Sequence, residues 1–180
     1  MPDSLLLPPL SKVIDYEGKG NFAIKKYYHW PFSFFYQKKL KMILSIIDKR
    51  RNYRFILDYG SGPAEIFRES LSNFGQRVDC VDKLDTIDGK YDLIVCASVL
   101  EFVNLKETLP YLKSHLLQSG ELIGSSPMDT KLSRLYFKLI GDNLTRNTHQ
   151  QILRELHKHF WVVKTKEWFG LYFSFKAYPK

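Results

Sequence analysis

Apolar positions along this chain follow two spacings, which separate predicted helices from predicted strands. Between residues 31 and 52 the apolar side chains fall at steps of three and four, so we expect a helix with one apolar stripe. Pro31 suits the first turn of that helix, and Lys38 and Lys41 fall on its polar side. The stripe consists of Phe32, Phe35, Tyr36, Leu40, Ile43, Leu44 and Ile47.

Beyond residue 53 short apolar runs alternate with helical patterns. The apolar runs predict strands at 54–60, 77–82, 91–98 and 121–127. The helical patterns span 63–75, 109–120 and 148–160. Residues 160–180 are rich in aromatic and β-branched side chains and predict a hairpin that turns near Gly170. We therefore expect a single α/β domain with a mostly parallel central sheet and a C-terminal antiparallel hairpin.

Two segments have the spacing of a helix capping box, in which a side chain at each end bonds to the backbone at the other. Thr148 and Gln151 predict the start of the helix at 148–160. Ser98 and Glu101 have the same spacing, so we interpret Glu101 as a capping residue. Its carboxylate is also a candidate for proton transfer.

The segment Asp58-Tyr59-Gly60-Ser61-Gly62 lies where the first predicted strand hands over to a helix. Glycines there permit unusual backbone angles and let a ligand approach the main chain closely. In an α/β sheet, ligands bind at the carboxyl ends of strands, which is where this segment lies. A dinucleotide-binding loop needs a third glycine, and this chain has Glu65 at that position, which suits a diphosphate poorly.

The pattern D-x-G-x-G resembles the cofactor loop of class I methyltransferases, a Rossmann-like family that binds S-adenosylmethionine. Asp82, at the end of the second strand, matches the family's ribose-binding acid, and the segment after the third strand matches the lining of the methionine end. The resemblance covers about residues 40–180. It implies these cofactor-binding residues: Asp58, Tyr59, Gly60, Ser61, Gly62, Asp82, Lys83, Ala97 and Ser98.

Three departures from the family pattern stand out. Ala64 replaces a frequent third glycine, and Phe102 follows Glu101 where many relatives have histidine. Only residues 83–90 separate the second strand from the third, fewer than a crossover with a helix needs. We therefore expect the region between the second and fourth strands to be reduced, with Asp85 or Asp88 as adenine contacts.

Methyl transfer is a direct displacement, so the protein chiefly aligns the reactants. If the acceptor must lose a proton, His149, His29 and Glu101 are the candidate bases. Residues 128–147 lie where the family inserts a substrate lid, and they combine apolar with basic side chains. That mixture favours a small-molecule acceptor or a lipid or saccharide intermediate.

The uneven distribution of charge along the chain leaves other functions open. The net charge is +8, and residues 1–57 carry 11 Lys/Arg against 4 Asp/Glu, or +7. That basic third, which begins with a lead-in at 1–30 ahead of the methyltransferase domain at 31–180, suits an anionic partner such as RNA or a membrane surface. One alternative is therefore an RNA methyltransferase that uses this basic third. A second alternative, based on Ala64 and the shortened crossover, is an inactive binding module with the same fold.

The two cysteines, Cys80 and Cys96, each lie inside an apolar run and are interpreted as buried thiols. Without paired cysteines or a His/Cys cluster, we expect neither a disulfide framework nor a metal site. A cytoplasmic location follows, with attachment to a membrane surface as an open alternative.

Overall fold

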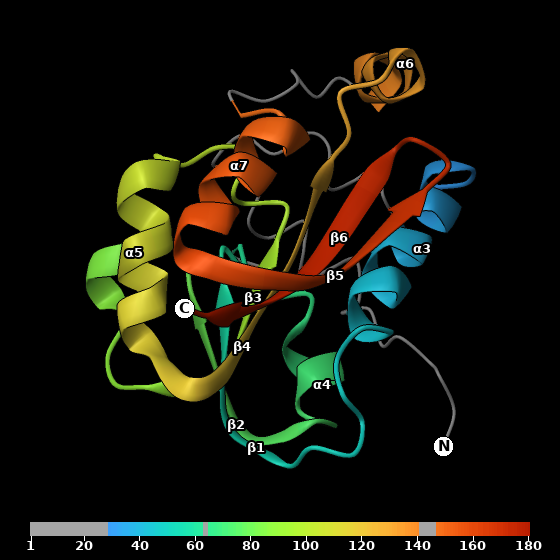
Figure 1. Cartoon of the computed structure of the whole chain (residues 1–180). Coiled ribbons are helices and arrows are strands. Elements are labelled where there is room, and N and C mark those ends of the chain that lie inside the picture. Colours follow the sequence, from blue (N-terminus) through green and yellow to red (C-terminus); the bar gives the residue numbers. More distant parts are fainter. Residues whose placement is uncertain (1–28, 63–64, 141–146) are drawn as a thin grey trace.

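The computed structural model describes residues 29–62, 65–140 and 147–180 (Figure 1). In this part of the chain six strands form one sheet in the order β2-β1-β3-β4-β6-β5. The first four run parallel, and β6 is antiparallel to both β4 and β5. Their bounds are β1 Tyr53–Tyr59, β2 Gly75–Val81, β3 Tyr91–Ala97, β4 Leu116–Pro127, β5 Phe160–Trp168 and β6 Tyr172–Pro179. The expected parallel sheet with a C-terminal hairpin is confirmed.

Helices cover both faces of the sheet. One face carries α5 and α7, the other carries α3 and α4, and α6 lies beyond the end of β4 (Figure 1). Their bounds are α3 Phe32–Leu44, α4 Arg68–Leu71, the 3₁₀ helix η2 Leu84–Thr86, α5 Leu105–His115, α6 Lys131–Ile140 and α7 His149–His159. The predicted capping box at Thr148 and Gln151 is present at the start of α7.

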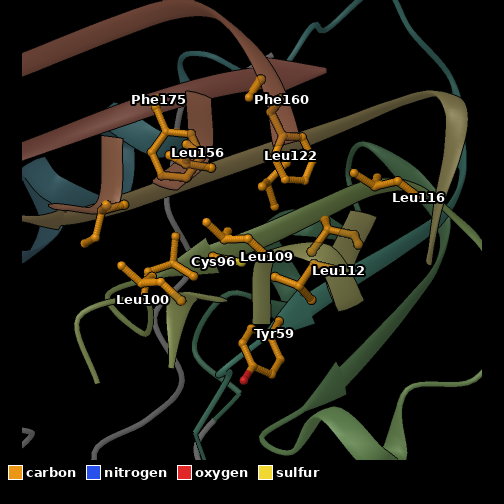
Figure 2. Close-up of a cluster of buried hydrophobic side chains, with 14 of the residues drawn as sticks. Tyr59, Cys96, Leu100, Leu109, Leu112, Leu116, Leu122, Leu156, Phe160 and Phe175 are labelled. Atoms are coloured by element: carbon orange, nitrogen blue, oxygen red, sulfur yellow. The ribbon is translucent and has the colours of Figure 1, made fainter. Parts of the chain in front are cut away.

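The core has a layer on each side of the sheet. Side chains alternate along β3, so that Ile94 and Cys96 face α5 and α7 while Leu93 and Val95 face α3. Figure 2 shows the first layer, in which Leu109 and Leu156 are fully buried. Truncating either leucine to alanine is expected to cost about 2–5 kcal/mol of stability. A smaller cluster joins α6 to β6 and α3.

The helix predicted at 63–75 is much shorter in the structure. Residues 63 and 64 lie outside the described ranges, and the regular helix is α4, Arg68–Leu71. After α4, the side chains of Ser72 and Asn73 donate hydrogen bonds to the backbone carbonyls of Arg68 and Glu69. Such local side-chain bonds compete with helix propagation, and the chain then enters β2.

The helix predicted at 109–120 is displaced toward the N-terminus. It begins at Leu105, because the Asn104 side chain accepts a hydrogen bond from the Lys106 amide and caps it. Strand β4 already starts at Leu116, before the Gly120 that was expected to end the helix. At Gly120 a Cβ would lie 2.8 Å from the Leu117 carbonyl oxygen, so close packing explains this glycine.

The expected reduction after the second strand is confirmed. Residues 83–90 hold a single 3₁₀ turn, and β2 is the edge of the sheet. A hollow of about 890 Å³ lies along this edge, lined by Arg54, Arg77, Asp88 and Lys90 among others. None of Asp58, Gly60, Gly62 and Asp82 lines it, so this hollow lies beside the glycine loop rather than within it.

Within the described ranges, no helix combines the length and apolar character needed to cross a membrane.

Candidate cofactor site

The glycine loop bends at the carboxyl ends of β1 and β2. Gly60 and Gly62 have φ of +76° and +66°, angles that favour glycine. The Gly60 amide donates to the Val81 carbonyl at 2.7 Å, and the Gly62 amide donates to Oδ1 of Asp82 at 2.8 Å. The structure thus brings together the loop and the predicted ribose-binding acid, although they are 20 residues apart.

The two glycines differ in the space around them. A Cβ added at Gly60 would lie 2.5 Å from two carbon atoms of Val99, so this glycine is needed for packing. A Cβ at Gly62 would meet nothing within 4 Å. The open side of the bend is therefore at Gly62.

Asp58 is a buried carboxyl group at the base of the bend. It is 1% exposed, and neither carboxyl oxygen has a hydrogen-bond partner among the described residues. Burial, followed by the nearby carboxylates of Asp82 and Glu65, raises its pKa from 3.8 to about 7. A buried acid without partners is costly, so a ligand with positive charge or hydrogen-bond donors would stabilise it.

The other predicted cofactor residues surround the bend unevenly. The Tyr59 side chain is buried against α5 and Thr108, so only its backbone faces the loop (Figure 2). Ser61 donates weakly to the Gly62 carbonyl at 3.4 Å, and Lys83 is an exposed residue that precedes η2. Ala97 ends β3 beside Ser125 of β4. Asp85 and Asp88, the suggested adenine contacts, are exposed.

Ser98 has a strained backbone at the end of β3. Its φ is +58°, which is uncommon for a residue other than glycine, and its amide donates to the Ser125 carbonyl at 2.9 Å. Strained residues persist where the surrounding structure holds them, often at functional sites. Ser98 is thus fixed at the carboxyl edge of the sheet, level with the bend.

Lys39 is a residue of this region that the sequence reasoning missed. It is 5% exposed, and Nζ donates to Oγ of Ser98 at 3.1 Å. The ammonium also lies 4.7 Å from the ring centre of Tyr36 and 5.5 Å from that of Tyr172. Its position three residues after Tyr36 and four before Ile43 puts it on the apolar stripe, which was the available signal.

The capping box predicted at Ser98–Glu101 is wrong. Ser98 has a left-handed backbone and no helix begins there, since Asn104 caps α5 instead. Glu101 is 1% exposed and accepts a hydrogen bond from Oγ of Ser126 at 3.0 Å. Its partner lies on β4, 25 residues away, which local spacing could not reveal.

No model of a known protein family matches this chain, and no curated protein matches it. Solved structures do. It is similar to the N-methyltransferase NodS from Bradyrhizobium japonicum WM9, solved with S-adenosyl-L-homocysteine, at 13% identity over 82% of this chain and 87% of that one, with a TM-score of 0.56. It is also similar to the magnesium protoporphyrin IX methyltransferase ChlM from Synechocystis PCC 6803, likewise with bound S-adenosylhomocysteine, at 16% identity over 80% and 82%, with a TM-score of 0.54.

A third structure, an O-methyltransferase family protein from Burkholderia thailandensis, matches at 14% identity with a TM-score of 0.62. That match covers 79% of this chain and 55% of the other. The chain has the class I methyltransferase fold. Because these identities are low, the likeness shows the fold alone.

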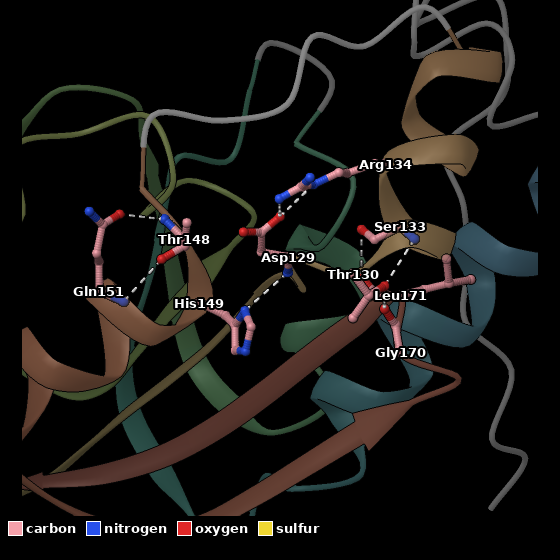
Figure 3. Close-up of polar contacts among 9 residues, drawn as sticks. All are labelled: Asp129, Thr130, Ser133, Arg134, Thr148, His149, Gln151, Gly170 and Leu171. Atoms are coloured by element: carbon pink, nitrogen blue, oxygen red, sulfur yellow. Dashed lines mark hydrogen bonds and ion pairs between the residues drawn. The ribbon is translucent and has the colours of Figure 1, made fainter.

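His149, a candidate base, lies in this methyltransferase fold at the first residue of α7 (Figure 3). Its Nδ1 accepts a hydrogen bond from the Asp129 amide at 3.0 Å. In the neutral ring the proton is then on Nε2, so His149 offers a donor rather than a basic nitrogen. This geometry argues against His149 as the general base.

His29, the other candidate histidine, is exposed just before α3. The expected lead-in at 1–30 lies almost wholly outside the described residues. Of the basic segment 1–57, the structure therefore describes only residues 29–57.

Both cysteines are free thiols. Cys96 is buried as expected, whereas Cys80 is half-buried at the hollow along β2. Burial raises the pKa of Cys80 to about 12, so its thiol stays protonated and poorly reactive. Among the described residues no group of three His, Cys, Asp or Glu side chains is arranged to hold a metal ion.

Proposed function

We propose that this protein transfers a methyl group from S-adenosylmethionine to a small, partly apolar acceptor. Asp58 supports this proposal most directly. It is a buried carboxyl without a hydrogen-bond partner among the described residues, and it lies below the bend whose Gly62 amide is bound by Asp82. A carboxyl in this position suits a cation, and S-adenosylmethionine carries a sulfonium and an ammonium group. A diphosphate would be repelled by the same carboxyls.

The residues at the bend fit such a cofactor. The open side of Gly62 admits a ligand close to the main chain, and Asp82 has a second oxygen for a ribose hydroxyl. The backbone of Tyr59–Gly62 would hold the cofactor, with Asp58 beneath it. Asp82 and Lys83 would lie on one side of the cofactor, and Ala97 and Ser98 on the other. Two similar folds, NodS and ChlM, were solved with S-adenosylhomocysteine, which supports this choice.

The bound cofactor would supply an activated methyl group, and the chain's own residues would position the acceptor. A direct displacement needs the attacking atom, the methyl carbon and the sulfur in line. Ser98 and Lys39 are fixed at the carboxyl edge of the sheet and are suited to orient a polar group of the acceptor. Because His149 Nδ1 already accepts a bond, its role would be to donate a hydrogen bond through Nε2.

Aromatic side chains beside Lys39, at the carboxyl edge of the sheet, favour an acceptor with an aromatic or other apolar part. The ring centres of Tyr36 and Tyr172 lie 4.7 Å and 5.5 Å from the Lys39 ammonium, and the Tyr136 ring lies 6.2 Å from that of Tyr172. The hydroxyls of Ser125 and Ser174, paired across β4 and β6, are buried without hydrogen-bond partners among the described residues. An acceptor with one or two polar atoms would satisfy them. Nothing in the described ranges favours RNA over a small molecule.

The test is transfer of labelled methyl from S-adenosylmethionine to a panel of small phenols, carboxylic acids, amines and lipid-soluble acceptors, with tRNA included. We expect turnover of a small acceptor by the wild type and at least tenfold less by Gly62→Val. Methylation of tRNA alone would overturn the acceptor class. No binding of S-adenosylmethionine and no methylation of any acceptor would overturn the proposed function.

A further inference from the structure

Large apolar side chains are exposed at one end of the molecule, around α6. They come from three neighbouring places: the start of α3, the outer side of α6, and the turn between β5 and β6. The exposed fraction ranges from 50% at Phe34 and Leu132 to 84% at Trp30. We define the α6 patch as Trp30, Phe34, Leu132, Leu135, Leu139 and Phe169.

Helix α6 divides its solvent side into two stripes. Leu132, Leu135 and Leu139 are spaced at steps of three and four and lie on one stripe, each at least half exposed. Lys131, Arg134 and Lys138 form an adjoining basic stripe. The opposite side of the helix is buried, with Tyr136, Phe137 and Ile140 in the core. Among the described residues, these three leucines therefore lie outside the buried core.

Phe169 occupies a backbone position that costs energy for its residue type. In the turn Trp168–Leu171, Phe169 and Gly170 both have positive φ, of +48° and +65°, and the Leu171 amide donates to the Trp168 carbonyl at 2.9 Å. Such a turn prefers asparagine, aspartate or glycine at the Phe169 position. The ring is nevertheless 76% exposed. The ring packs edge-on against Trp168, with 5.3 Å between the ring centres, but turn geometry does not explain an aromatic side chain there.

The parts of the patch are held rigidly together. Thr130, just before α6, donates to the Gly170 carbonyl at 2.6 Å and accepts from the Ser133 amide (Figure 3). The Met128 amide donates to the Leu171 carbonyl at 2.9 Å. On the other side, Trp168 contacts the rings of Phe34 and Phe35. The hairpin turn, α3 and α6 thus present one surface.

Charge around the patch is mainly positive. The basic stripe of α6 is joined by Lys38, whose ammonium lies 5.4 Å from the Phe34 ring. Of the acids nearby, Asp129 is paired with Arg134 at 2.8 Å, and Glu167 is exposed on β5. A leucine stripe beside a basic stripe is the arrangement by which helices lie in the surface of an anionic bilayer. A nucleic acid would use the cations and leave the three leucines in water.

We propose that the α6 patch docks the protein on the surface of an anionic lipid membrane. The leucines, Trp30 and Phe169 would enter the boundary between headgroups and acyl chains, and the basic stripe would contact lipid phosphates. The proposal goes beyond methyl transfer, because docking needs neither cofactor nor acceptor. Binding to vesicles without cofactor therefore tests it separately from the proposed function.

The experiment is co-sedimentation of the full-length protein with vesicles of phosphatidylcholine alone, or of phosphatidylcholine mixed with phosphatidylglycerol, at low and raised salt. We expect binding to the mixed vesicles that weakens with salt and little binding to phosphatidylcholine alone. The double variant Leu135→Ser/Leu139→Ser and the double variant Lys131→Glu/Lys138→Glu should each lower the partition coefficient by about tenfold or more.

Matched controls are exposed residues of the same kinds elsewhere. Leu117→Ser and Trp161→Ser change exposed apolar residues away from α6, and Lys106→Glu/Arg154→Glu changes cations on α5 and α7, across the sheet from α3. Melting curves check that all variants fold. Equal binding by patch and control variants, or no wild-type binding to anionic vesicles, would overturn the proposal. A patch variant that splits a dimer in size-exclusion chromatography, without any vesicle binding, would also overturn it and assign the patch to a second copy.

Discussion

The Asp82 carboxylate holds the glycine loop by accepting a hydrogen bond from the Gly62 amide, with 2.8 Å between Oδ1 and N. This bond ties the ends of β1 and β2 together at the candidate cofactor site. We expect Asp82→Ala to weaken S-adenosylmethionine binding roughly 10–100-fold, because it removes a charged acceptor. Calorimetric titration measures the loss. Asp48→Ala is the matched control and should bind normally, because this exposed aspartate also accepts a hydrogen bond from a backbone amide, that of Arg50, but lies ahead of β1.

Gly62 gives a test of the open side of the bend. The Cβ of a valine there would meet no described atom within 4 Å, but the side chain would occupy the space proposed for the ligand, so cofactor binding should be lost while the chain still folds. Gly89→Val is the matched control, since Gly89 also has positive φ, of +87°, and nothing within 4 Å. Both variants should lose about 1–3 kcal/mol of stability from backbone strain. Equal cofactor affinity in the two variants would contradict the site.

Gly60 is unsuited to that test. A side chain there would collide with Val99, so Gly60→Val disturbs the packing between the loop and the residues after β3. Loss of binding in this variant would report on the fold as much as on the ligand.

Asp58 predicts a pH dependence of stability. Its pKa is raised to about 7 in the folded protein, so the native state keeps a proton that the unfolded chain releases near pH 4. The free energy of unfolding should therefore fall as pH rises from about 4 to 7, by on the order of 4 kcal/mol from this group. Urea denaturation of wild type and Asp58→Asn checks this.

The variant should show a flatter profile over that window and be more stable than the wild type at pH 8. Affinity for the cationic cofactor should rise with pH toward 7, as the carboxylate forms, in the wild type only. Identical profiles for the two proteins would show that Asp58 does not titrate in this range.

Glu121 predicts a large loss of stability when removed. This buried carboxylate contacts Nζ of Lys176 at 2.8 Å, Arg51 at 3.2 Å and the Tyr53 hydroxyl at 3.0 Å. Glu121→Ala leaves the Lys176 ammonium buried without its partner, so we expect a loss of about 3–5 kcal/mol by urea denaturation. The exposed Glu107→Ala on α5 should change stability by less than about 0.5 kcal/mol. A small loss at Glu121 would mean that water reaches the cluster.

Much of the fold follows from the sequence because its signals are local. The apolar runs of β1 and β3 and the glycines after β1 need only neighbouring residues to be recognised, and the short link at 83–90 could be measured directly. Thr148 and Gln151 likewise satisfy each other within one helical turn. The strands, the short link and the capping box are confirmed, whereas the cofactor role of the glycines stays a prediction.

The predictions that failed depend on distant partners. Glu101 matched a capping pattern, yet its hydroxyl partner Ser126 lies on another strand. Lys39 was overlooked because lysine is usually exposed, although its place on the apolar stripe of α3 required burial. Its partner Ser98 is 59 residues away. Packing decides which hydroxyl and charged groups meet at the edge of the sheet. The spacing of residues along the sequence does not reveal those contacts.

Calorimetric titration of the wild-type protein with S-adenosylhomocysteine measures whether the glycine bend binds the cofactor. We expect saturable binding of one ligand per chain, weakened by Asp82→Ala and lost in Gly62→Val. A wild-type protein that gives no heat and no thermal shift with this ligand, or that binds it unchanged in both variants, would contradict the assignment of the glycine bend as the cofactor site.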